Sequence, residues 1–176
     1  MKHIADLEQT LHELRTSFDE NLTRPLQQTI SETRKMMVGQ FGREKYAIDL
    51  HYIQEIIKVP HVTRIPTAPV IIEGIINLSG EIVSVSKIHS ILRVSPLNDE
   101  DSKRIVITKN LRFQTGLIID MVHGILDIEV DSIRRTSQAS HTLKNDWVDG
   151  TLFWNNELVI LLNLPNLLES QEAQTG

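Results

Sequence analysis

The sequence predicts a mainly β protein made of two similar β subdomains, preceded by a helical arm. The first observation is a hairpin pattern in residues 72–85, where an aliphatic run enters Ser79 and Gly80 and a β-branched run follows. The second is that residues 148–161 repeat this pattern without a gap, with two asparagines at the turn, where Asn also tolerates a positive φ. The third is a composition of 40% hydrophobic but only 5% aromatic residues, which predicts a core mainly of Ile, Leu and Val.

Length, charge and cysteine usage exclude several classes of protein. A chain of 176 residues accommodates one domain of ordinary size, or one duplicated domain with an extra arm. Its formal charge of −5 provides no basic field for nucleic acid or anionic lipid. The absence of cysteine excludes disulfides, thiolate metal sites and cysteine nucleophiles. With no apolar signal at the N-terminus and no run near the ~20 apolar residues that span a bilayer, we expect a cytoplasmic protein without direct membrane insertion.

Residues 1–34 form the predicted helical arm. Apolar side chains recur at spacings of three and four, at Ile4, Leu7, Leu11, Leu14 and Phe18. Pro25 follows Thr23 at a position suited to the start of a second helix, so we expect two helices or one kinked helix over about residues 2–34. Two interpretations remain open: the apolar stripe packs on the protein's own β body, or it binds a partner or a second copy.

Strands and short helices are expected in both halves of the remaining chain. In the first half we expect strands at residues 36–41 and 46–50, a strand or single helical turn at 53–57, the hairpin, and a short helix at 88–94. Residues 95–102 are typical of an exposed connector. In the second half we expect strands at 104–108 and 113–119, a segment at 116–126 that repeats 47–57, a surface loop at 136–146, the second hairpin, and a short helix entered at Pro165. The duplication therefore extends over both halves.

The order and spacing of these motifs resemble the CheW family of bacterial chemosensory adaptors. The resemblance is carried by YAIDL at 46–50, IQEII at 53–57, VTRIP at 62–66, AP at 68–69, EGIINLSG at 73–80, IV at 82–83, GLIID at 116–120 and LVILLNL at 158–164. It covers about residues 36–168, nearly everything after the arm. The expected organisation is an arm at 1–34, a CheW-like domain at 35–170 and a tail at 171–176.

The resemblance implies two SH3-like five-stranded barrels packed on a shared hydrophobic core. It also implies a non-enzymatic scaffold that bridges a CheA-type histidine kinase and the cytoplasmic tips of methyl-accepting chemoreceptors, at membrane-associated receptor arrays. We expect no catalytic, cofactor or metal site, because the seven histidines are scattered, in surface or loop positions, and no nucleophile set or phosphate loop occurs. Two alternatives stay open: an adaptor of a non-flagellar chemosensory system, such as one for surface motility, and a structural protein that self-associates through its arm.

Nine residues form the candidate partner-binding set: Ile53, Glu55, Ile57, Val62, Arg64, Asn77, Ser79, Lys87 and His89. The aliphatic members offer anchors for a helix in a groove, since the resemblance implies helical receptor tips as partners. Glu55 and Arg64 are expected to set the register of that helix by charge. The alternative is that the aliphatic members simply fill the first barrel.

Two places depart from the pattern of the family. Ser79 stands where the family usually carries an arginine thought to pair with the equivalent of Glu55, which leaves Glu55 to water or to a nearby base such as Arg64 or Lys58. After the hairpin, Lys87 and His89 replace the acid and the base of the usual Asp-Leu-Arg. Both departures are expected on the partner-binding surface, which predicts an adaptor tuned to a particular kinase or receptor.

Overall fold

The computed structural model describes residues 32–109, 111–134 and 145–172 of the chain. Most of the predicted arm, most of the loop at 136–146 and most of the predicted tail lie outside the described residues. Thr33 and Arg34, placed in the arm from sequence, instead begin a β-strand, because they pair with Glu129 and Ile128 of a distant strand. Among the described residues, no helix has the length and hydropathy of a membrane span.

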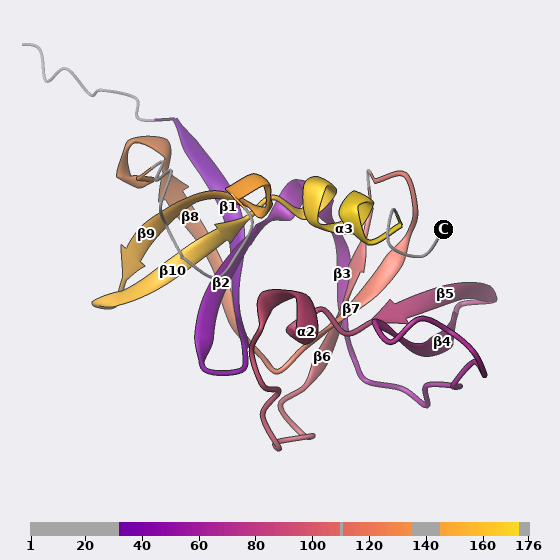
Figure 1. Cartoon of the computed structure of the whole chain (residues 1–176). Coiled ribbons are helices and arrows are strands. Elements are labelled where there is room, and N and C mark those ends of the chain that lie inside the picture. Colours follow the sequence, from indigo (N-terminus) through magenta and orange to yellow (C-terminus); the bar gives the residue numbers. More distant parts are fainter. Residues whose placement is uncertain (1–31, 110, 135–144, 173–176) are drawn as a thin grey trace, which may run out of the picture. The chain divides into compact units, whose positions relative to one another are not determined.

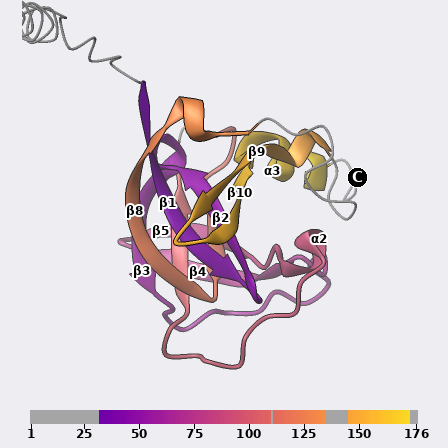
Figure 2. The ribbon, with the colours of Figure 1, turned by 90° about the vertical axis from the view of Figure 1, so that its left-hand side faces the viewer.

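Two five-stranded sheets make up the described body (Figure 1). The first sheet runs in the order β8 (Met121–Glu129), β1 (Thr33–Phe41), β2 (Glu44–Asp49), β10 (Glu157–Leu162) and β9 (Val148–Trp154). The second runs β3 (Ile53–Lys58), β6 (Arg104–Thr108), β7 (Thr115–Ile119), β5 (Glu81–Ser86) and β4 (Ile72–Leu78). The prediction of a mainly β protein with two five-stranded subdomains is confirmed. Figure 2 views the body from the side of the first sheet and shows its strands strongly curved.

The two sheets have the same internal order, but each takes strands from both halves of the chain. Strands β1 and β2 are completed by β8, β9 and β10, whereas β6 and β7 are completed by β3, β4 and β5. In the second sheet Val85 pairs in parallel with Gly116, and in the first sheet Leu161 pairs in parallel with Ala47. These are the positions that the sequence repeat aligns, so the duplication is confirmed in the backbone pairing.

Both hairpin turns have the conformation that their sequences predict. Ser79 and Gly80 have φ of 52° and 98°, and Asn155 and Asn156 have φ of 49° and 65°. Two successive positive φ values define the type I′ turn, whose twist matches that of the flanking strands. Gly and Asn are the residues that adopt this backbone at least cost.

Short helices follow the two hairpins. Helix α2 (His89–Leu92) ends at Arg93, whose φ of 57° stops it before Pro96, as predicted. Helix α3 (Leu164–Glu172) has Pro165 near its start, where the missing N–H has no helical partner to lose. Three single-turn 3₁₀ segments, η1 (Leu50–Tyr52), η2 (Val130–Ser132) and η3 (Asn145–Trp147), complete the described elements.

The core has three parts, and strand alternation distributes residues among them. Met36 and Val38 pack inside the first sheet, while Met37 between them faces a core shared with the second sheet. In the second sheet Ile105 and Ile107 face the sheet's own core and Val106 faces the shared one. Helices α2 and α3 contribute to the shared core, between the two sheets (Figure 1). These strands are buried on both faces, so the body is held together as one unit.

Candidate functional site

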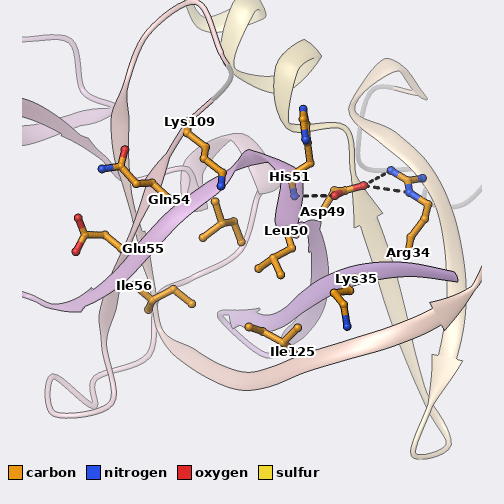
Figure 3. A pocket seen from close by; sticks show the side chains of 11 residues that line it. Arg34, Lys35, Asp49, Leu50, His51, Gln54, Glu55, Ile56, Lys109 and Ile125 are labelled. Atoms are coloured by element: carbon orange, nitrogen blue, oxygen red, sulfur yellow. Dashed lines mark hydrogen bonds and ion pairs between the residues drawn. The ribbon is translucent and has the colours of Figure 1, made fainter.

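The candidate site is a groove between β3, an edge strand of the second sheet, and strands β1 and β8 of the first sheet (Figure 3). Its volume is about 660 Å³. The lining residues are Arg34, Lys35, Asp49, Leu50, His51, Ile53, Gln54, Glu55, Ile56, Lys109 and Ile125. Two members of the candidate set, Ile53 and Glu55, are among them.

The floor of the groove is apolar. Leu50 and Ile56 are half-buried against the shared core, and Ile125 on β8 has 54% of its surface exposed. The 3₁₀ turn that carries Leu50 is fixed by Asp49, whose carboxylate accepts the His51 N–H at 2.8 Å. Apolar side chains supplied by two different sheets therefore form one open surface.

A register shift in β3 decides which of its side chains reach the groove. The pairing with β6 shifts between Ile53 and Glu55, so Gln54 and Glu55 are both exposed although they are neighbours. Ile53 turns inward and is only 5% exposed, in the shared core. Ile53 therefore borders the groove but is too buried to serve as an exposed anchor.

Most of the groove's charges are already paired. Arg34 contacts Asp49 at 2.5 Å, and Lys35 contacts Asp127 at 2.9 Å. Gln54 accepts a hydrogen bond from Gln114 at 2.8 Å. These contacts hold the rim in place. Among the described residues, the side chains of Glu55 on β3 and Lys109 after β6 have no such partner and face solvent.

A second group of candidates gathers around Glu73. Its carboxylate contacts Lys87 at 2.8 Å and Arg64 at 3.3 Å, so Arg64 pairs with Glu73 and not with Glu55. The hydrogen bond from Lys87 is the largest influence that lowers the pKa of Glu73, and the charges of both bases act in the same direction. Sequence reasoning missed Glu73 as a site residue. The signal was the acid before glycine in both hairpins, since the equivalent Asp149 accepts a hydrogen bond from Asn163 at 2.8 Å.

Ile57 and Val62 do not line the groove. Both are half-buried and pack against the core of the second sheet. Beside Val62, Thr63 exchanges two backbone hydrogen bonds of 2.9 Å with Ile75 of β4. The alternative that these aliphatic residues fill a barrel therefore describes them better than the role of exposed anchors.

Asn77 and Ser79 lie at the exposed tip of the first hairpin. Asn77 Oδ1 accepts the Gly80 N–H at 2.8 Å, which stabilises the turn. Within the described ranges, no side-chain hydrogen bond or ion pair joins Ser79 to Glu55. The structure thus gives Asn77 a structural role and leaves Ser79 open to a partner.

His89 is the clearest correction to the candidate set. It was expected at the surface, but it is 2% exposed, and its Nε2 atom lies 2.9 Å from Asp120 Oδ2. Its ring also packs edge-on against Phe41, with the ring centres 5.4 Å apart. Because α2 packs into the shared core, its first residue points inward, where a carboxylate from the end of β7 receives it. In the part of the chain that the structure describes, no group of three His, Cys, Asp or Glu could hold a metal ion.

The chain matches a known protein family and several of its named members. The family model described as "CheW-like domain" matches residues 35–172. The chain is 29% identical over 147 residues to the chemotaxis protein CheW of Treponema pallidum, covering 81% of this chain and 86% of that protein. It is 27% identical over 150 residues to the CheW of Klebsiella aerogenes, with 82% and 90% covered.

A more distant sequence relative and a solved structure extend this picture. Protein PilI of Pseudomonas aeruginosa is 23% identical over 131 residues, covering 70% of this chain and 72% of that protein. The crystal structure of the scaffolding protein TtCheW from Thermoanaerobacter tengcongensis superposes with a TM-score of 0.70 at 28% identity, covering 77% of this chain and 88% of that one. Sequence, sheet order and the solved structure thus agree, and the chain belongs to the family of CheW-like domain proteins.

Proposed function

We propose that this protein is a chemotaxis coupling adaptor that holds a chemoreceptor helix in the groove beside β3 and joins it to a CheA-type histidine kinase. The observation that carries the proposal is the open apolar floor of Leu50, Ile56 and Ile125, bordered by charged side chains. Apolar floors with a polar rim are the form that amphipathic helices bind. The names and extents of the CheW relatives support the same role.

The geometry suits a scaffold. The groove is made by elements of both sheets, so a helix bound there touches both at once. A partner that prefers one arrangement of the sheets shifts the population towards it, and the adaptor passes that preference to the kinase. This role needs binding and no chemistry. It places the protein on the cytoplasmic side, at membrane-associated receptor arrays.

A second candidate is the same adaptor role in a non-flagellar system, for example one that controls surface motility. The match to Protein PilI supports this candidate, because that relative is not named as a CheW protein. Self-association through residues 1–34 remains a further proposal, motivated by the apolar stripe of the arm.

The test is binding of the full chain to a soluble receptor-tip fragment and to the kinase from the same organism. Both are expected to bind, and all three are expected to co-elute. Ile125→Asp places a charge on the groove floor and is expected to weaken the receptor fragment's binding at least tenfold, since about 1.4 kcal/mol corresponds to a factor of ten.

Ile82→Asp is the matched control, because Ile82 is 75% exposed but lies outside the groove. It is expected to leave receptor binding unchanged. Equal losses in the two variants, or no binding by a folded wild-type chain, would contradict the proposed function.

A further inference from the structure

Two side chains at the groove have no charge partner within the described ranges. The side chains of Glu55 and Lys109 are exposed, and neither makes a hydrogen bond or ion pair there. Arg34 and Lys35, by contrast, are engaged by carboxylates of the protein itself. Counter-charges for Glu55 and Lys109 must therefore come from solvent or from a partner.

The two unpaired groups differ in where they point. The Lys109 N–H donates to Tyr52 O at 2.9 Å, which fixes the start of the Lys109 side chain beside η1. In Figure 3 the Lys109 side chain extends towards the middle of the groove, whereas Glu55 points outward from β3. Lys109 is thus the charge that a helix on the apolar floor meets.

Lys109 is the cation of the groove that has no partner among the described residues. The chain carries a formal charge of −5, and of the three Lys or Arg side chains that line the groove, Arg34 and Lys35 are paired with Asp49 and Asp127. An acidic partner is repelled by an acidic surface and attracted to an unpaired cation. The docking face that fits beside Lys109 is therefore acidic.

We infer that the helix bound in the groove carries a carboxylate beside its apolar stripe, and that this carboxylate pairs with Lys109. Lys109 is then a specificity-determining residue of the site, and it acts by selecting receptor helices with an acid at that position. The inference rests on the proposed function, because it concerns the same groove. A charged residue at the edge of an apolar interface affects the rate of association and its salt dependence more than it affects the shape complementarity of the two surfaces.

The experiment measures the affinity of the full chain for the soluble receptor-tip fragment at low and high salt. Lys109→Glu is expected to weaken binding roughly tenfold at low salt and to reverse the salt dependence of this contact, since salt screens the repulsion between the new Glu and the partner's carboxylate. Lys58→Glu is the matched control, because Lys58 is exposed at the end of β3 and does not line the groove. It is expected to bind like the wild type. Exchanging the receptor acid for lysine is expected to restore binding to the Lys109→Glu chain.

Equal binding and equal salt dependence of the two lysine variants, with the wild type binding normally, would overturn the inference and leave the proposed function intact. A wild-type chain that does not bind the fragment overturns both. If the protein without receptor is a dimer that Lys109→Glu dissociates, a second copy occupies the groove, and the assignment of a receptor helix is wrong.

Discussion

His89 and Asp120 form a buried pair between the two sheets, with 3% and 0% of their side-chain surfaces exposed. The oxygen of Asp120 that lies near His89 Nε2 also accepts the Gly42 N–H at 2.6 Å. One carboxylate thus joins α2, the end of β7 and the turn between β1 and β2. His89 Nδ1 and Asp120 Oδ1 are buried without a partner among the described residues, so the contact fixes geometry at a cost in solvation.

Asp120→Ala is expected to lower the free energy of unfolding by about 3 kcal/mol, because it leaves a buried N–H and a buried imidazole without their acceptor. Urea unfolding at neutral pH measures the change. Asp127→Ala is the control, since that carboxylate is 60% exposed in its pair with Lys35 and is worth less than about 1 kcal/mol. Similar losses in the two variants would mean that the Asp120 contact has no special role.

Gly74→Ala is expected to destabilise the second sheet. A Cβ at this position lies 2.3 Å from Thr63 O and 2.8 Å from Val62 Cγ1, so the crossing chain must move. The expected loss is about 2–3 kcal/mol, in the range of overpacked cores. Gly80→Ala, in the same hairpin, adds a Cβ that meets nothing within 4 Å and isolates the cost of the backbone conformation. Thermal unfolding measures the loss of stability in both variants. A smaller loss for Gly74→Ala than for Gly80→Ala would contradict the steric explanation.

The Glu73–Lys87 pair predicts a small dependence of stability on pH. The pKa of Glu73 is lowered in the folded state from its ordinary value of 4.5, chiefly by the Lys87 hydrogen bond. Its stabilising effect is therefore complete above about pH 4.5 and is lost as the pH falls through the lowered folded value. Because Lys87 is 37% exposed, the effect stays below about 1 kcal/mol.

Urea unfolding of the wild type and of Glu73→Gln between neutral and acidic pH tests this. The difference between the two chains is expected to shrink as the pH falls below about 4.5. Glu81→Gln, an exposed acid in the same hairpin, corrects for the general effect of removing a carboxylate. Parallel curves for wild type and Glu73→Gln would refute the assignment.

Tyr46 predicts a dependence at the alkaline end. Burial, followed by the hydrogen bond and charge of Glu44, raises the pKa of Tyr46 above its ordinary value of 10.0. The neutral phenol therefore stabilises the fold below about pH 10, and this contribution is lost at higher pH as the unfolded chain ionises. Tyr46→Phe is expected to be less stable than wild type at neutral pH, with a deficit that shrinks above pH 10.0. Guanidinium unfolding across that range checks it, and a constant deficit would contradict it.

The sequence predicted the features that depend on neighbouring residues. Turn conformation follows from Ser79-Gly80 and from the paired asparagines, because positive φ is a local requirement. Strand pairing between the halves was not predictable, because alternation shows which face of β1 is buried but not that β8 lies beside it.

The candidate site was harder to predict for the same reason. Ile53 and Glu55 are two residues apart, yet a register shift buries one and exposes the other. His89 is polar and follows a strand, so its burial depends on Asp120, a partner 31 residues away. Lys109 carries no local signal, since its position at the groove depends on β3 and β8 meeting beside it.

The exchange of strands between the halves has a consequence for the origin of the fold. A single repeat, β1 to β5, holds no complete sheet, because its first two strands and its last three belong to different sheets. Two separate copies of such a unit, each lending three strands to the other, would build the same pair of sheets as a domain-swapped homodimer. The connector at 95–102 joins the two repeats in one chain, which makes their encounter intramolecular and independent of concentration.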